Sequence, residues 1–115
     1  MYNKSMASTI SFVEYVCDIG SRAGSLIAKR LFGEFGLHFD GKYIGAICGD
    51  QIFIKPTNAG REVLKTPNEQ EPYQGAGIKY FLIEDIDDAE AFTQLLLATW
   101  KDLPFPKPKK LKEKK

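Results

Sequence analysis

Few side chains in this sequence could act as a nucleophile or a general base. One histidine, His38, and two cysteines, Cys17 and Cys48, are spread over 115 residues. Nucleophilic catalysis needs a base within hydrogen-bond reach of the nucleophile and a third group that orients the base. The strands predicted below put Tyr43 beside His38, bring no serine near it and turn Cys48 to the opposite face. We therefore expect His38 to be a partly exposed strand residue, and we assign no catalytic residue.

The chain also lacks the spacing of a metal or cofactor site. Two distant cysteines and one histidine do not form a zinc-binding pattern, and we expect both cysteines to be buried thiols. Neither Gly33-Glu34-Phe35-Gly36 nor Gly75-Ala76-Gly77 has the residues or the following helix of a phosphate-binding loop. An acidic cluster could in principle hold Mg²⁺, but its simpler interpretation is the capping of a helix. This cluster consists of Glu84, Asp85, Asp87, Asp88 and Glu90.

Basic residues offer a different chemistry, the binding of phosphate or of an acidic partner. Lys29, Arg30 and Lys42 could form a modest patch, or could instead pair with nearby acids. The segment after Leu103 has six lysines and one acid, which gives it a net charge of +5 and leaves −4 on the rest of the chain. Its lysines could contact nucleic acid, although such a run is more often a solvated end. The tail residues predicted for that contact are Lys107, Lys109, Lys110 and Lys112.

The length of the chain suits one folded domain with short tails. Its hydrophobic fraction of 43% is typical of a globular protein, and its apolar runs are far shorter than a membrane span. We expect a cytoplasmic protein without a membrane partner. We divide the chain into a flexible N-terminus (1–7), a folded domain (8–103) and a basic Pro/Lys tail (104–115) that we expect to be disordered.

Two helices are predicted at the ends of this domain. Ser11-Phe12-Val13-Glu14 fits a capping box, after which apolar residues recur with helical spacing until Gly20, and Gly24 could stop the helix in a left-handed conformation. A second helix begins after Asp87-Asp88-Ala89-Glu90 and ends before the prolines of the tail. The segment 25–32 fits either a strand or a helical turn. Residues 68–77 are predicted to form a surface loop.

Hairpins are predicted between these helices. Asp40-Gly41 suits a type I′ turn, a second turn is expected at Gly49-Asp50, and Tyr80-Phe81-Leu82-Ile83 is a further strand. The simplest register places Leu37 opposite Ile44 and Gly36 opposite Gly45. One predicted face then carries Phe35, Leu37, Ile44, Ala46, Cys48 and Phe53, and the other carries Tyr43, Ile47, Ile52 and Ile54 with Gly36 and Gly45. The fold class is therefore α+β, an antiparallel sheet of consecutive hairpins flanked by an N-terminal and a C-terminal helix.

Both predicted faces of the sheet are apolar, so we expect both to be covered, by a helix of the chain or by another subunit. The adjacent Gly36 and Gly45 would leave a smooth patch for a partner, although close packing inside the monomer is the alternative. We predict contacts with a protein partner or a second copy at Lys29, Arg30, Gly36, Lys42, Tyr43 and Gly45.

Several segments resemble the N-terminal domain of the TfoX/Sxy competence regulators, over roughly residues 8–103. The resemblance implies an α+β domain without known catalytic residues, which in full-length relatives precedes a helical domain and takes part in activating transcription of DNA-uptake genes. We expect a stand-alone copy of this domain. The residues that carry the resemblance are Phe12-Val13-Glu14-Tyr15-Val16, Ala28-Lys29-Arg30-Leu31-Phe32-Gly33-Glu34-Phe35-Gly36-Leu37, Asp40-Gly41-Lys42 and Asp50-Gln51-Ile52-Phe53-Ile54-Lys55.

The resulting hypothesis is a non-enzymatic regulatory domain that acts through protein contacts. A nucleic-acid accessory that uses the lysine tail with Lys29 and Arg30 is the first alternative, and it predicts binding that weakens steeply with salt. A small enzyme is the second alternative. It would need a pocket in which His38 or Cys17 stands beside another titratable group.

Overall fold

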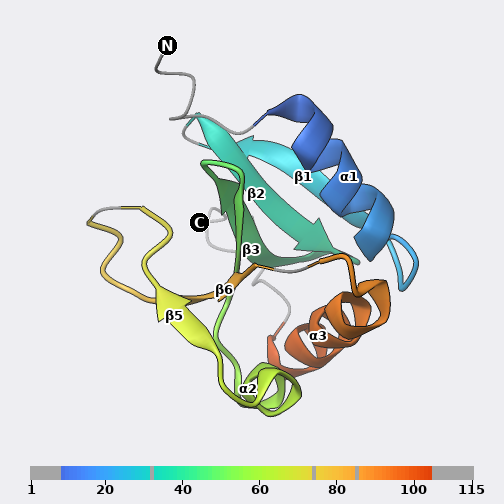
Figure 1. Cartoon of the computed structure of the whole chain (residues 1–115), viewed down its shortest axis with the longest axis vertical. Coiled ribbons are helices and arrows are strands. Elements are labelled where there is room, and N and C mark those ends of the chain that lie inside the picture. Colours follow the sequence, from blue (N-terminus) through green and yellow to red (C-terminus); the bar gives the residue numbers. More distant parts are fainter. Residues whose placement is uncertain (1–8, 32, 74, 85, 105–115) are drawn as a thin grey trace, which may run out of the picture.

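A six-stranded sheet forms the centre of the computed structural model, which describes residues 9–31, 33–73, 75–84 and 86–104 (Figure 1). All of its strand pairs are antiparallel, in the order β1-β2-β3-β4-β6-β5. The predicted α+β class with flanking helices is confirmed. The predicted tails lie outside the described residues except for Pro104. In chain order the elements are α1 (Ile10–Gly20), β1 (Leu26–Leu31), β2 (Glu34–Phe39), β3 (Lys42–Cys48), β4 (Gln51–Ile54), α2 (Asn58–Leu64), β5 (Asn68–Gln70), β6 (Tyr80–Ile83) and α3 (Ala89–Asp102).

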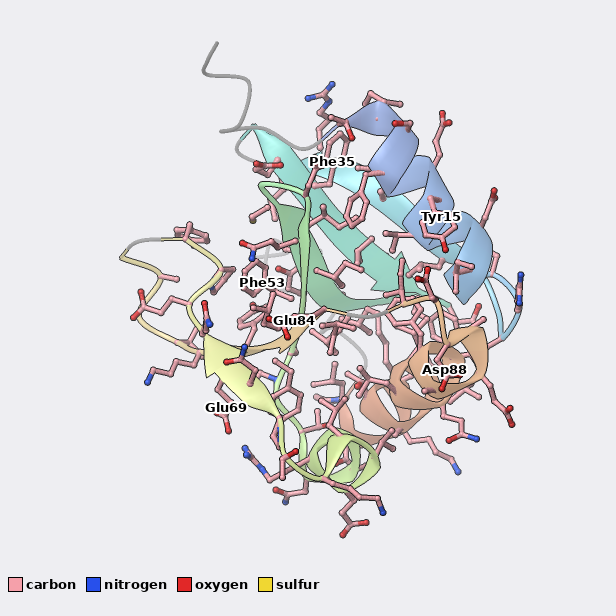
Figure 2. All side chains as sticks on the ribbon, viewed as in Figure 1. Tyr15, Phe35, Phe53, Glu69, Glu84 and Asp88 are labelled. Atoms are coloured by element: carbon pink, nitrogen blue, oxygen red, sulfur yellow. The ribbon has the colours of Figure 1, made fainter. Side chains whose placement is uncertain are left out.

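The main hydrophobic core lies between the helices and one face of the sheet, which we call the helix face. Helix α1 contacts β1 and α3, and α3 also contacts α2 and β3. Figure 2 shows side chains filling the space between helices and sheet. Burial of these apolar surfaces is the main force that holds the helices on the sheet. Core residues include Val13, Val16 and Ile19 of α1, Phe92, Leu95 and Leu96 of α3, and Leu37, Ile44, Ile47, Ile52, Ile54 and Phe81 of the sheet.

The start of α1 differs from its prediction. Its N-cap is Thr9, whose hydroxyl accepts a hydrogen bond from the Phe12 amide (3.4 Å), so the capping box predicted at Ser11 is wrong. The Thr9 amide donates to Asp50 Oδ1 (2.7 Å) in the β3–β4 turn. This hydrogen bond between distant segments places the start of α1 two residues earlier than the capping box at Ser11 predicted. At the other end α1 stops at Gly20 with Ser21 as its C-cap, and Gly24 has no positive φ, so the left-handed stop predicted at Gly24 is wrong.

Helix α3 begins with an aspartate cap, one residue later than the capping signature that the sequence suggested. Asp88 accepts a hydrogen bond from the Ala91 amide (3.2 Å) and serves as the N-cap. Asp87 instead accepts a hydrogen bond from the Tyr15 hydroxyl (3.0 Å), which joins the two helices. The acidic cluster therefore contributes to helix capping and to helix packing.

Two segments become strands because a neighbouring strand supplies hydrogen bonds. The ambiguous segment 25–32 contains β1, which pairs with β2 along its whole length. Residues 68–70, predicted to belong to a loop, form β5 at the sheet edge and pair with β6, so that part of the loop prediction is wrong. Pairing with an existing sheet edge overrides the weak strand preference of a polar segment.

The two predicted hairpin turns are present. Asp40 and Gly41 have φ values of 44° and 89°, as a type I′ turn requires, and Gly49 and Asp50 have φ values of 59° and 60°. These turns connect β2 to β3 and β3 to β4 with the predicted partners at their ends, including His38 opposite Tyr43.

A β-bulge changes the register of the first hairpin away from its turn. His38 faces Tyr43, but the next partners are Leu37 and Gly45, so Ile44 is an extra residue in β3. The predicted pairs of Leu37 with Ile44 and of Gly36 with Gly45 are wrong for this reason. An extra residue moves every later side chain of the strand to the other face.

The bulge also reassigns the two faces. Ile47, Ile52 and Ile54 join Phe35 and Leu37 on the helix face. Ala46 and Cys48 turn to the other face, which we call the open face. Its small apolar cluster consists of Phe53, Tyr80 and Leu82 with Cys48 packed against them. Residues of the 71–79 connection cover part of the open face, and no helix of the described chain covers it.

Candidate binding hollow on the open face

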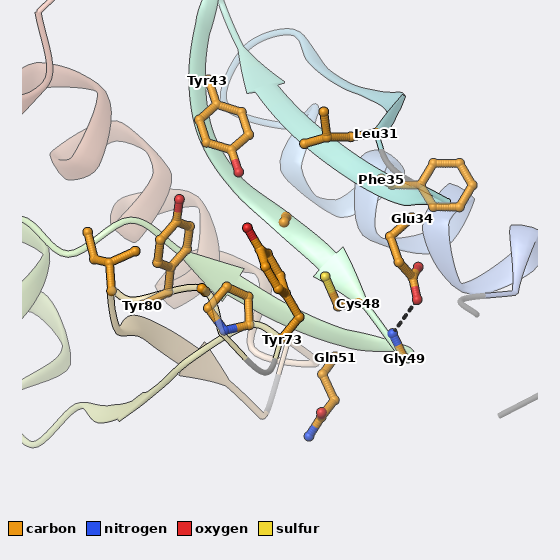
Figure 3. Close-up of a pocket in the computed structure, with 13 residues that line it drawn as sticks. Leu31, Glu34, Phe35, Tyr43, Cys48, Gly49, Gln51, Tyr73 and Tyr80 are labelled. Atoms are coloured by element: carbon orange, nitrogen blue, oxygen red, sulfur yellow. Dashed lines mark hydrogen bonds between the residues drawn. The ribbon is translucent and has the colours of Figure 1, made fainter. Parts of the chain in front are cut away.

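A hollow of about 740 Å³ lies on the open face, between the strands and the connection from β5 to β6 (Figure 3). Ala46 and Cys48 of β3 line its floor. Three tyrosines line it from separate parts of the chain: Tyr43 from β3, Tyr73 from the connection and Tyr80 from β6. The bulge creates this arrangement, because without the extra residue Tyr43 and Cys48 would face opposite sides of the sheet.

The tyrosine hydroxyl groups point toward one another in the hollow (Figure 3). Burial, a side-chain hydrogen bond with Tyr80 and the nearby Tyr73 raise the pKa of Tyr43 well above its usual range. Tyr43 is therefore a neutral phenol at any physiological pH. The cluster offers aromatic ring faces together with hydroxyl groups, which suits a ligand that is mostly apolar but carries some hydrogen-bonding groups.

One end of the hollow combines a thiol and a carboxylate. Burial and the neighbouring Glu34 raise the pKa of Cys48 to about 11. Glu34 lies across from the end of β3, where its Oε2 accepts a hydrogen bond from the Gly49 amide (2.9 Å). Because nearly all of the Cys48 thiol stays protonated at neutral pH, it is a poor nucleophile there.

Apolar side chains remain exposed around this hollow. Tyr73 is 61% exposed and Ile78 is 50% exposed, both in the connection. On the edge strand β1, Ile27 and Leu31 are also exposed, and Leu31 lines the hollow. Exposed apolar residues that cluster around a concave surface are typical of binding sites.

A second, smaller hollow of about 280 Å³ adjoins the first through Tyr43, which lines both. Its other lining residues include His38, Lys55, Leu103 and Pro104. The His38 ring contacts the Tyr43 ring edge-on, with 5.6 Å between their centroids. Burial and the charge of Lys29 lower the pKa of His38. The imidazole and the Cys48 thiol thus line different hollows.

Three of the predicted contact residues lie on the open face. Tyr43 lines both hollows, and Lys29 is exposed on β1 opposite the buried Gly36 of β2. A side chain at Gly36 would come close to the Tyr43 ring (3.2 Å). Arg30 is exposed on the same edge strand, with its guanidinium carbon 4.8 Å from the centroid of the Phe35 ring. Contacts of these residues with a partner remain predictions.

The other two residues of the predicted patch, Lys42 and Gly45, lie in the interior. Lys42 is only 5% exposed, and its ammonium donates hydrogen bonds to the backbone oxygens of Trp100 (2.8 Å) and Leu103 (2.5 Å). Gly45 packs so closely on β4 that an added Cβ would lie 2.1 Å from the Phe53 carbonyl oxygen. Lys42 therefore holds the end of α3, and Gly45 permits two strands to approach. The four tail lysines lie outside the described residues.

Sequence reasoning missed the tyrosine cluster and Ile78. Tyr73 belongs to the segment 68–77, which the composition indicated to be a polar loop, Ile78 follows that segment, and Tyr80 was assigned only to a strand. Large apolar residues in a long Gly/Pro-rich connection were the available signal, because such loops are often functional.

Within the described ranges, no group of three or more His, Cys, Asp or Glu side chains is placed to hold a metal ion. No helix in this part of the chain is both long and apolar enough to cross a bilayer.

Comparison with known proteins agrees with the resemblance seen in the sequence. A protein from Spirochaeta aurantia, described as "Uncharacterized 12.7 kDa protein in trpE 5'region", is 37% identical over 110 residues, which cover 95% of each chain. The family model described as the TfoX N-terminal domain matches residues 18–102, from within α1 to the end of α3. The matched range contains the whole sheet and both hollows apart from Leu103 and Pro104. This chain belongs to the TfoX N-terminal domain family.

Proposed function

We propose that this protein is a non-enzymatic regulatory domain that binds an extended, largely apolar segment of a partner protein in the tyrosine-lined hollow. By resemblance to the TfoX/Sxy regulators, the regulated process is transcription of DNA-uptake genes. The single observation that carries the proposal is this hollow, with exposed apolar residues around it, on the face of the sheet that the helices leave open.

The shape of the hollow supports a peptide as the ligand. Its lining follows β3 from Tyr43 to Gly49, and at about 3.3 Å per residue this stretch spans roughly 20 Å. About six residues of an extended polyproline-type segment cover the same length. Tyrosine rings with free edges and hydroxyl groups are the usual lining of grooves that bind such segments.

The chemistry of the hollow supports binding rather than catalysis. Its thiol has a pKa of about 11 and is not paired with the one imidazole of the chain, which lines the neighbouring hollow. The pKa of its Tyr43 hydroxyl is shifted away from neutrality and not toward it. A catalytic acid or base is usually tuned in the opposite direction.

The nucleic-acid alternative has less support on the described surface. Lys29 and Arg30 are exposed on β1, but Lys42 is used to hold α3. Self-association through the open face also remains a prediction, which light scattering of the purified protein would test.

The binding proposal can be tested with a pair of matched variants. Peptides selected from a display library against the full chain would be measured by titration calorimetry against the wild type, Ile78→Asp and Leu97→Asp. Ile78 and Leu97 are similarly exposed, at 50% and 44%, but only Ile78 lines the hollow. We expect Ile78→Asp to weaken binding about tenfold or more, because a carboxylate in the apolar hollow must be desolvated, and Leu97→Asp to leave it unchanged. Equal loss in both variants, or the absence of any saturable peptide, would contradict the proposal.

A further inference from the structure

The last described residues of the chain lie beside the tyrosine-lined hollow. After α3, Leu103 and Pro104 line the small hollow together with Tyr43, and Tyr43 is also a wall of the large one. The position of these residues is fixed, because the buried Lys42 ammonium holds the Leu103 carbonyl oxygen. Residues that follow Pro104 therefore start within reach of the large hollow.

The composition of the following segment fits an aromatic groove. Pro104, Pro106 and Pro108 alternate with Phe105 and Lys107. Proline at every second position favours the extended polyproline conformation, which aromatic-lined grooves bind at a low cost in conformational entropy. At about 3.1 Å per residue, the seven residues from Phe105 to Leu111 span roughly 20 Å, the length of the β3 stretch that lines the hollow.

The charges of the segment after Pro104 and of the large hollow are also complementary. Glu34 is the one charged residue among the described residues that line the large hollow, and it lies at the end far from Pro104. An extended segment that starts at Pro104 would bring its lysines toward that end. Its first residues, Phe105 and Pro106, would pass the near end, where the positive charge of Lys55 makes a lysine unfavourable. The tail as a whole carries +5 against −4 on the rest of the chain.

We infer that residues 105–111 of this chain bind in its own tyrosine-lined hollow and compete there with the partner segment. The inference rests on the proposed function for the identity of the hollow as a peptide site, and it adds the regulation of that site. Because the tail is tethered, its effective concentration at the hollow is about millimolar, so even a weak contact occupies the site. A partner segment must displace the tail. The apparent affinity of the partner is therefore its intrinsic affinity multiplied by the fraction of hollows that the tail leaves open.

Cys48 provides a built-in reporter of occupancy, since its thiol lines the floor of the hollow. Its rate of alkylation by iodoacetamide would be measured in the full chain and in a variant with Phe105, Pro106 and Pro108 changed to serine. Lys114→Ser/Lys115→Ser is the control for changes at the chain end. The alkylation of Cys17, a partly buried residue of α1 that packs against the main core, is followed in the same samples as an internal standard.

We expect the triple serine variant to react about tenfold faster at Cys48 if the tail occupies the hollow about 90% of the time, because only the open state reacts. A synthetic peptide of residues 104–115 should restore the protection in a saturable manner, whereas the same peptide with the three serines should not. Magnetisation transfer between the Phe105 and Tyr43 rings in the wild type would report the contact without relying on thiol chemistry.

Equal Cys48 rates in the wild type and the triple variant would overturn the inference, and so would protection that disappears on dilution, because a tethered tail acts independently of concentration. Library peptides added to the triple variant separate the two proposals. If they protect Cys48 although the tail does not, only the tail inference fails. If they also leave Cys48 unprotected, the proposed function fails as well.

Discussion

Replacing Lys42 by methionine would remove the cation that joins the β2–β3 turn to the end of α3. The Lys42 ammonium lies 3.8 Å from the centroid of the Trp100 ring and donates to the carbonyl oxygens of Trp100, in the last turn of α3, and of its C-cap Leu103. Trp100 in turn donates from Nε1 to the Asp40 carbonyl (3.2 Å). Strand and helix are therefore held by a local network in which Lys42 makes the charged contacts.

The magnitude follows from these contacts. A hydrogen bond to a charged group contributes about 1.5–3 kcal/mol, and the attraction between a cation and the C-terminal end of a helix adds about 0.3–1 kcal/mol. Part of this gain offsets the desolvation of the buried ammonium, and the methionine side chain keeps some packing on Trp100. We expect Lys42→Met to lower the free energy of unfolding by about 2–4 kcal/mol, which shifts a urea midpoint by roughly 1–3 M.

Urea unfolding followed by the fluorescence of Trp100, the one tryptophan of the chain, would measure the change in the free energy of unfolding caused by Lys42→Met. Lys101→Met is the matched control, since Lys101 lies in the last turn of the same helix but is exposed. Lys101→Met should lower the free energy of unfolding by less than about 1 kcal/mol, because an exposed cation contributes only a solvent-screened attraction to the C-terminal end of the helix dipole. A Lys42→Met midpoint no lower than that of Lys101→Met would refute the role assigned to the buried ammonium.

Three further predictions concern the strands. Gly45→Ala should lower the free energy of unfolding by about 3 kcal/mol or more in thermal or urea unfolding, because the added Cβ would meet a backbone oxygen of β4 at 2.1 Å. Gly36→Ala is the control: its Cβ meets only side-chain atoms, at 3.2 Å, and it should cost less than about 1 kcal/mol. Similar losses of stability in the two variants would contradict the observed register. With its pKa at about 11 against an ordinary 9.0, the Cys48 thiol should be alkylated at least about a hundredfold more slowly at neutral pH in the native protein than in denaturant, and a native rate close to the denatured one would contradict its burial. Burial and the charge of Lys29 lower the pKa of His38 below 6.5 in the folded protein. Below about pH 6.5 the unfolded state therefore binds more protons at this histidine than the folded state, and the free energy of unfolding should fall as the pH drops. In His38→Gln this part of the pH dependence should be absent, and an unchanged dependence of stability on pH would assign it to other groups.

The residues on the open face explain why the site itself was only partly predictable. Tyr43 and Gly36 were expected at a partner surface and do lie at or beneath the hollow, but Gly45 and Lys42 were assigned to the same surface and are interior. The sequence showed two apolar strand faces, but the simplest register divided the residues wrongly between them. That assignment depends on the register of the hairpin, and the register depends on the extra residue at Ile44.

By itself, the sequence determined the features that depend on a few adjacent residues. Asp40-Gly41 and Gly49-Asp50 tolerate the positive φ values of tight turns, so both hairpins could be located, and the apolar spacing before Pro104 was enough to locate α3. Family membership followed from motifs of the same local kind.

Only the tertiary structure decided the bulge, the cap at Thr9, the burial of Lys42 and the hollow that the three tyrosines share. Each of these depends on a partner distant in the chain: β4 behind Gly45, Asp50 beside Thr9, the end of α3 above Lys42, and the 71–79 connection across the open face. Local preferences among such alternatives differ by about 1 kcal/mol or less, and burial against a distant segment contributes several times that amount.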